Sequence, residues 1–237
     1  MKLPKKISPD NLVETIVEIR MIPLCNPELW LGMVSVRLKD IGYKFVQFSQ
    51  SLLGKDENDQ SQRDSVCFFV KSDIRFIMQN NSLIFNCNLG KYVGWDVYSS
   101  EIKQVINAVQ ESGIANCFDR TSIRYISEYK DTPILDHIKG TINIGESKLG
   151  LNNQELKLSR QEDNIKVFVS LSNLKKYNTT NGERKVSLFD VNIYENFAES
   201  CSADDIMISL NKIHQIEKEV FFGLLKDDFI ETLNPEY

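Results

Sequence analysis

Hydrophobic and polar residues alternate along much of the chain, and this alternation predicts β-strands. Residues 12–21 show the pattern most clearly. One side of this segment consists of Val13, Thr15, Val17 and Ile19. The other side consists of Glu14, Glu18 and Arg20. One apolar side and one charged side are typical of a strand that buries a single face. Similar segments predict strands at residues 43–48, 65–70, 73–79, 82–89, 120–129, 141–145, 155–161, 164–171 and 185–195.

In residues 27–42 the apolar residues recur every three or four positions, as in a helix, and no longer at every second position. Asn26 precedes this segment and belongs to a residue type that is favoured as an N-cap. The predicted inner stripe consists of Leu29, Met33, Val36 and Leu38 or Ile41. We therefore expect a helix that packs on the sheet through this stripe.

Two further long helices follow from the same period. One begins near Asp96 or Ser99 and ends at Gly113, with an apolar stripe at Ile102, Val105, Ile106 and Val109. The other begins at Ser202, and Asp205 stands three residues later as in a capping box. Its predicted inner face is Ile206, Leu210, Ile213, Val220 and Leu224, and we expect it to continue through Phe229 and Ile230.

The order of these elements predicts an α+β fold. Asn80-Asn81 and Asn181-Gly182 favour tight turns between consecutive strands, which indicates antiparallel sheets covered by helices. A short helix is expected at residues 133–138. We predict two structurally similar halves, residues 1–130 with two helices and residues 131–237 ending in a long helix, packed as one compact unit.

Composition narrows the function classes. The 237 residues carry a net charge of -5, whereas a general coat for nucleic acid would be basic. No apolar run approaches the roughly 20 residues of a membrane span, and no apolar run follows the basic start MKLPKK. We therefore predict a cytoplasmic protein without membrane contact. Residues 55–64 are polar and without period, which predicts an exposed loop.

Sequence motifs for cofactors and metals are absent. The five cysteines are far apart in sequence, the chain has two histidines, and no glycine-rich phosphate loop or G-x-S-x-G segment is present. We predict no cofactor and no metal. Cys67 and Cys87 lie in predicted strands and are expected to be small apolar core residues.

Two sets of residues could still support catalysis. His214 could act as a general base oriented by Glu217, or it could pack at the boundary of its helix. The carboxylates Asp73, Asp190 and Glu195 lie in or near strands, where a metal-dependent hydrolase would gather its acids. Neither set forms a diagnostic motif.

Aromatic residues are candidates for a contact surface. Tyr92, Trp95 and Tyr98 fall close together, either as an exposed platform or as a packed corner between strand and helix. Phe221 and Phe222 are adjacent on a helix, where both cannot face one side. We therefore expect Phe222 to be an exposed contact residue.

The segment RTSIRYISEYKD, residues 120–131, places Arg120 and Arg124 on one side of a strand. If this strand neighbours residues 12–21, these arginines could pair with Glu14 and Glu18 in a cross-strand ladder. Alternatively, unpaired arginines on an open face would bind anions or RNA. The sequence leaves both alternatives open.

Four segments resemble a sporadically distributed family of uncharacterised bacterial proteins. They are KLPKKISPDNLVETIVEIRM, KYVGWDVYSSEI, TSIRYISEY and FIETLNPEY. The family pattern has V-E-x-x-x-E-I-R near its start, a Y-x-x-W segment before a helix and an R-x-G-[LV]-R-Y-[IV]-N strand. Here Ser122 and Ser127 replace the common glycine and asparagine. The resemblance brings no catalytic motif. The patchy distribution resembles that of accessory or antiviral defence genes, which implies an interaction role.

The leading hypothesis is a non-enzymatic protein-binding module, such as an antitoxin-like, chaperone-like or defence-complex subunit. We expect its partner to be another protein or a second copy of the chain. The alternative is a metal-dependent hydrolase or nuclease acting on nucleic acid. The third hypothesis is RNA or anion binding without catalysis, with nucleic acid the less favoured partner.

Overall fold

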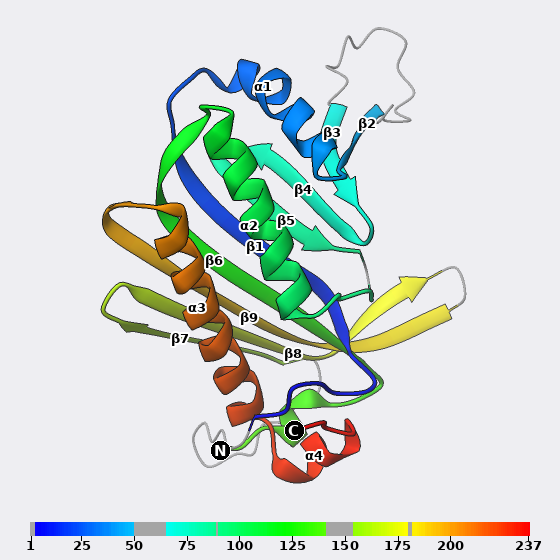
Figure 1. Ribbon diagram of the computed structural model, residues 1–237. Helices are drawn as coiled ribbons and strands as arrows, with labels where there is room; N and C mark the ends of the chain where they lie inside the picture. Colours follow the sequence, from blue (N-terminus) through cyan, green and yellow to red (C-terminus); the bar gives the residue numbers. More distant parts are fainter. Residues whose placement is uncertain (1–2, 50–64, 89, 141–153, 180–181) are drawn as a thin grey trace, which may run out of the picture.

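Antiparallel strands build one sheet in the computed structural model, which describes residues 3–49, 65–88, 90–140, 154–179 and 182–237 (Figure 1). The strands are β1 (Leu12–Pro23), β2 (Lys44–Ser49), β3 (Ser65–Lys71), β4 (Ile74–Gln79), β5 (Ser82–Cys87), β6 (Ala115–Lys130), β7 (Glu155–Glu162), β8 (Ile165–Thr179) and β9 (Gly182–Cys201). Their order across the sheet is β2-β3-β4-β5-β1-β6-β9-β8-β7. The predicted α+β class with antiparallel strands is confirmed.

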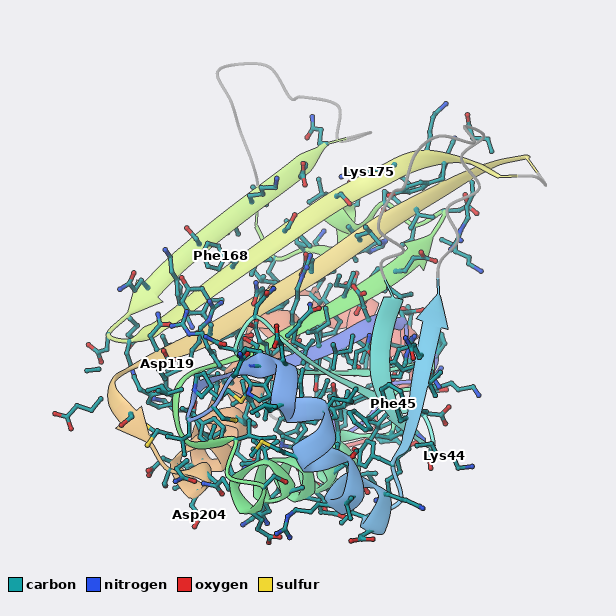
Figure 2. All side chains as sticks on the ribbon, turned by 90° about the horizontal axis from the view of Figure 1, so that it is seen from above. Lys44, Phe45, Asp119, Phe168, Lys175 and Asp204 are labelled. Atoms are coloured by element: carbon teal, nitrogen blue, oxygen red, sulfur yellow. The ribbon has the colours of Figure 1, made fainter. Side chains whose placement is uncertain are left out.

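The helices gather on one face of this sheet. They are α1 (Pro27–Asp40), α2 (Trp95–Glu111), α3 (Ala203–Leu224) and α4 (Asp227–Thr232), with a short 3-10 helix, η1, at Ile134–His137. Figure 1 shows α2 and α3 side by side in front of the strands, and Figure 2 shows the helices on one side of β7, β8 and β9. In the part of the chain that the structure describes, no helix covers the opposite face, which we call the open face.

The sheet is centred on the pair β1 and β6. Val17 lies opposite Phe85 of β5 and Ile123 of β6, and all three side chains are buried towards the helices. Ile19 is also fully buried, as its side of the alternation predicted. The two strands thus carry the central part of the core beneath α2 and α3.

Local signals fixed several boundaries correctly. Asn80 and Asn81 join β4 to β5 with φ angles of 51° and 59°, a conformation that asparagine tolerates well. Gly113 follows α2 with a φ of 71°. Of the Asn181-Gly182 turn, Gly182 is described with a φ of 116° and Asn181 lies outside the described residues. The predicted loop at 55–64 and strand at 141–145 lie outside them as well.

The prediction for the C-terminal helix is correct at the start of the helix and wrong at its end. Ser202 and Asp205 form the capping box, with the Asp205 amide donating to the Ser202 hydroxyl at 3.3 Å. The helix stops at Leu224, because Leu225 turns to an extended conformation and forms a bridge with Ile138. Phe229 and Ile230 belong instead to the separate helix α4.

The predicted inner stripe of α1 is correct at Leu38 and wrong at Leu29, Met33 and Val36. The buried residues are Trp30, Val34 and Leu38, whereas Leu29 is 56% exposed and Val36 is 66% exposed. Both sets recur at helical spacing, so the sequence period could not tell which one meets the core. Contacts with β2 and α2 decide the orientation.

No helix in the described ranges is long and apolar enough to cross a membrane.

The orientation of α1 can be tested by making the same substitution at its two valines, Val34 and Val36. We expect Val34→Ala to lower the free energy of unfolding by about 2 kcal/mol, since it removes two buried methyl groups and leaves a cavity. Val36→Ala should change it by less than about 0.5 kcal/mol, because the side chain is exposed. Urea unfolding of both variants measures the difference, and equal effects would contradict the orientation.

Candidate functional site

The outward side of α1 carries the densest exposed apolar surface of the described residues. The described residues expose twelve large hydrophobic side chains in all, and six of these lie between residues 22 and 36. These six are Ile22, Leu24, Leu29, Leu31, Met33 and Val36. Ile22 and Leu24 precede α1, and Leu31 lies on another side of the helix, whereas Leu29, Met33 and Val36 share one side. Scattered exposed apolar residues need no explanation, but such a shared side marks a candidate interaction surface.

Within this group, Leu29, Met33 and Val36 form a row along α1 that we call the outer stripe. Their spacing of four and three residues places them on one side of the helix, away from Trp30 and Val34. The Met33 sulfur lies 3.6 Å from the Cys25 sulfur, and beyond it Arg37 pairs with Glu111 of α2 at 2.8 Å. The outer stripe is therefore bounded on one side by α2 and open on the other.

The open face of the sheet holds the two arginines of the sequence prediction. Arg124 donates to Asp190 of β9 through two hydrogen bonds of 2.7 and 3.0 Å. This pairing raises the pKa of Arg124. The predicted ladder with Glu14 and Glu18 is wrong in its partners, because Arg124 lies opposite Ile16 in the register of β1 and β6.

Arg120 has a different environment. Its guanidinium lies 4.4 Å from the centre of the Tyr194 ring, and its buried Nε has no hydrogen-bond partner among the described residues. The neighbouring Arg20 pairs with Asp119 at 2.7 Å, and Glu18 accepts a hydrogen bond from Ser82 at 2.7 Å. Arg120 is thus the arginine of this region that keeps hydrogen-bonding capacity towards a ligand.

The predicted aromatic residues form a packed corner and not an exposed platform. Tyr98 is fully buried and donates to the Thr15 carbonyl at 3.2 Å. Tyr92 is partly buried, and its hydroxyl lies 3.0 Å from that of Tyr125. Trp95 is also partly buried and donates to Asn211 of α3 at 2.8 Å. The cluster joins the start of α2 to α3 and β6.

Two titratable residues of α3 lie within this corner. His214 stacks on Trp95 with ring centres 4.2 Å apart, and its Nδ1 is buried without a hydrogen-bond partner in the described chain. Burial lowers the pKa of His214 to about 4. Glu217 is 5% exposed, and burial raises its pKa to about 8. Near pH 7 both side chains are therefore neutral, and in the described residues no hydrogen bond joins them, so Glu217 does not orient His214 as a general base would require.

The expectation that Phe222 is exposed is wrong. Phe222 is 7% exposed and Phe221 is 8% exposed. Phe221 packs on Phe189 of β9 with ring centres 4.9 Å apart, and Phe222 packs edge-on against Phe221. Both are buried because the chain covers the end of α3 on more than one side.

The three strand acids do not converge. Asp190 binds Arg124, and Asp73 lies near Lys91 at 3.5 Å. Glu195 is buried and accepts from Ser209 at 2.5 Å and from Lys212 at 3.0 Å. Over the described ranges, no group of three His, Cys, Asp or Glu side chains could hold a metal ion.

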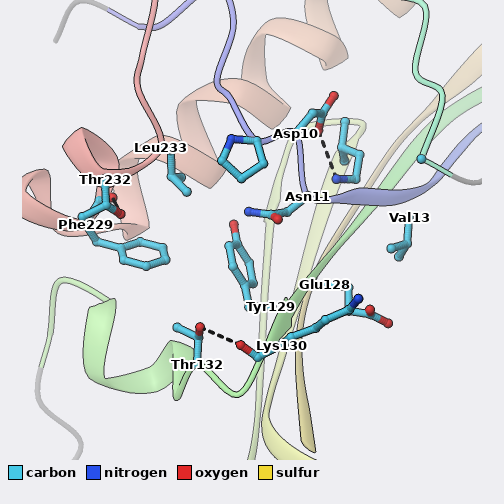
Figure 3. Close-up of a pocket in the computed structure, with 13 residues that line it drawn as sticks. Asp10, Asn11, Val13, Glu128, Tyr129, Lys130, Thr132, Phe229, Thr232 and Leu233 are labelled. Carbon is cyan, nitrogen blue, oxygen red and sulfur yellow. Dashed lines mark hydrogen bonds between the residues drawn. The ribbon is translucent and has the colours of Figure 1, made fainter. Parts of the chain in front are cut away.

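A cavity of about 540 Å³ lies between the N-terminal segment, the end of β6 and α4 (Figure 3). Phe229 and Leu233 form an apolar wall, and Asp10 and Asn11 line the opposite part. Tyr129 lies between them, and its buried hydroxyl has no hydrogen-bond partner in the described residues. The volume would accommodate a small molecule, but none of the sequence-predicted site residues lines it.

Sequence reasoning missed two features of these sites. Leu29, Met33 and Val36 were assigned to the core, although the low amphipathicity of α1 indicates apolar residues on more than one side. Glu217 was considered only as a partner for His214. Its position in the inward row with Leu210 and Ile213 was the available signal that it is buried.

No protein-family model matches this chain, and no curated protein is significantly similar to it. The family resemblance therefore stays a prediction, and the geometry of the described residues must support any function.

Stability should fall as the pH rises above neutrality because of Glu217. Between pH 6.5 and 8 this carboxyl is protonated in the folded chain and ionised in the unfolded chain, so the folded state binds more protons. The free energy of unfolding should decrease by up to about 1.4 kcal/mol per pH unit and level off above the folded pKa. His214 adds the opposite slope only below its ordinary pKa of 6.5.

Urea unfolding across this range measures the slope. Glu217→Gln should remove it, whereas Glu219→Gln, at an exposed position of α3, should retain it. An unchanged slope in Glu217→Gln would show that another group titrates.

Proposed function

We propose that this chain is a non-enzymatic protein-binding module that docks a partner on the outward side of α1. The carrying observation is the concentration of exposed apolar residues between Ile22 and Val36, half of all that the described chain exposes. Exposing these residues to water is unfavourable, and docking would bury them. The open sheet edges at β2 and β7 offer further contact surface.

Features elsewhere in the molecule favour binding over catalysis. In the described residues His214 has no hydrogen bond to Glu217, and the strand acids are engaged with arginine, lysine and serine, which leaves no observation in favour of the hydrolase alternative. The kind of complex, whether antitoxin-like, chaperone-like or defence-related, rests on the family resemblance alone. A cytoplasmic location rests on the sequence alone.

Two exposed valines allow a matched test of the docking surface. Val36 is 66% exposed on α1, and Val97 is 52% exposed on α2. When the tagged chain is purified from native cells, Val36→Glu should lose the co-purifying protein, and Val97→Glu should retain it. Neither variant should change the melting temperature, because neither side chain packs in the core.

If both variants retained the co-purifying protein equally, the contact would lie elsewhere on the molecule. A wild-type chain that purifies alone and does not self-associate would overturn the proposal.

A second candidate function, binding of single-stranded RNA, is favoured by the stacked pair Arg120 and Tyr194. Aromatic rings with adjacent arginines on an uncovered sheet face form platforms on which bases stack. Lys166 over the ring of Phe168, at 5.1 Å, repeats this combination on β8. The net charge of -5 weighs against a strong electrostatic contribution.

Fluorescence anisotropy with a labelled single-stranded RNA tests this second candidate. Arg120→Ala should weaken binding about tenfold, since it removes a phosphate contact and the ring's cationic neighbour. Arg124→Ala should bind as the wild type does, because Asp190 already occupies that guanidinium. Equal losses in both folded variants, or no binding by the wild type, would contradict it.

We also propose that the two halves share a common architecture. Each begins with a central strand, β1 or β6, continues through strands on its own side of the sheet, and ends in a long helix, α2 or α3. This division would fall before β6, near Gly113, and not at residue 131. Superposition of the two halves by their backbone atoms is the measurement that tests it.

A further inference from the structure

We infer that the outer stripe of α1 docks on the outer stripe of a second copy of this chain, with the two α1 helices antiparallel. This inference rests on the proposed function and names the partner of the same surface. The outer stripe alone would suit many apolar partners. The row of residues beside it specifies the second copy.

That row consists of Glu28, Gly32, Ser35 and Lys39. The spacings of four, three and four residues keep all four positions on one side of α1, next to Leu29, Met33 and Val36. Glu28 and Lys39 are exposed, and neither side chain has an ion-pair partner in the described residues. The row lies on the side of the outer stripe that faces away from the Arg37–Glu111 pair with α2.

In an antiparallel pair of α1 helices, this row of one copy faces the same row of the other copy in reverse order, so opposite charges meet. When two copies of α1 run antiparallel with their outer stripes in contact, Glu28 of each copy lies opposite Lys39 of the other, and Gly32 lies opposite Ser35. Glu28 and Lys39 are eleven residue steps apart, which is about three turns, or roughly 16 Å. Parallel helices in contact through the same stripes would place this row opposite the other flank of the partner's stripe, so Glu28 and Lys39 of the two copies would not meet.

The centre of the row leaves open space beside the outer stripe. A Cβ atom at Gly32 would meet nothing within 4 Å, so this position is open space on the outside of α1. Gly32 and Ser35 are small, so they leave room beside the outer stripes for the longer Glu28 and Lys39 side chains to reach the partner helix. The helix dipoles are then also antiparallel, which is favourable.

The expected complex is a symmetric and weak dimer. A two-fold axis through the middle of α1 makes both surfaces identical, as in most homodimers. One face of a 14-residue helix is smaller than the roughly 800 Å² that each partner buries in a standard interface. Association should therefore be reversible and should depend on protein concentration.

Sedimentation equilibrium of the purified full chain over a series of concentrations tests the inference. The wild type should show a monomer–dimer equilibrium that weakens as salt is added. Glu28→Lys and Lys39→Glu should each weaken dimerisation about tenfold, because each replaces two attractive pairs by two repulsive ones. The double variant with both reversals should restore the wild-type dissociation constant.

Two controls separate the interface from general effects. Glu199→Lys, at an exposed position of β9, changes the net charge as Glu28→Lys does and should leave the dimer unchanged. Val36→Glu should abolish the dimer while the melting temperature stays the same. A dimer that survives both single reversals, or a double variant that stays monomeric, would overturn the antiparallel arrangement.

A wild type that is monomeric at every concentration would overturn the second copy as partner. In that case, loss of a different co-purifying protein in Val36→Glu would still support docking on α1. If Val36→Glu changed neither measurement, the proposed function would fail as well.

Discussion

The pairing of β1 with β6 is the contact on which the rest of this structure depends. It joins the two sets of strands into one sheet, because β5 continues outward from β1 and β9 continues outward from β6. The same pair provides the surface for the helices. Thr15 of β1 accepts the Cys87 amide through its hydroxyl, and its carbonyl accepts the Tyr98 hydroxyl. A single position therefore links β1, β5 and α2.

In the described residues the helices cover one face of the sheet, and this affects both faces of the molecule. The open face keeps charged residues that pair along the strands, as Arg124 does with Asp190, and leaves Arg120 on Tyr194. On the covered face, α2 and α3 occupy the centre, and α1 packs towards the β2 edge. A helix at the periphery buries one side only, so the second apolar row of α1 remains exposed.

Two buried glutamates differ in their hydrogen bonds: Glu195 has several donors around it, and Glu217 has none among the described residues. Glu195 keeps its hydrogen bonds, since Ser209, Lys212 and Asn164 all donate to it, and these contacts fasten α3 to β9. Glu217 lies on α3 about two turns after Ser209, near Tyr92 and Tyr125, and no described side chain donates a hydrogen bond to it. Burial there favours the protonated form. The first arrangement stabilises the packing of α3, and the second makes stability depend on pH.

The sequence by itself determined the strands, the helix starts and the antiparallel character. Alternation identified β1 and its buried Val17 and Ile19, and the capping residues Asn26 and Ser202 marked two helix starts, because these signals depend only on nearby residues. The tertiary structure decided which of two apolar rows on α1 meets the core, which acid binds Arg124, and that Phe222 is covered. Each of these depends on strand register or on an element distant in sequence. The candidate docking surface belongs to this second group, since a residue is exposed only when nothing else in the fold packs on it.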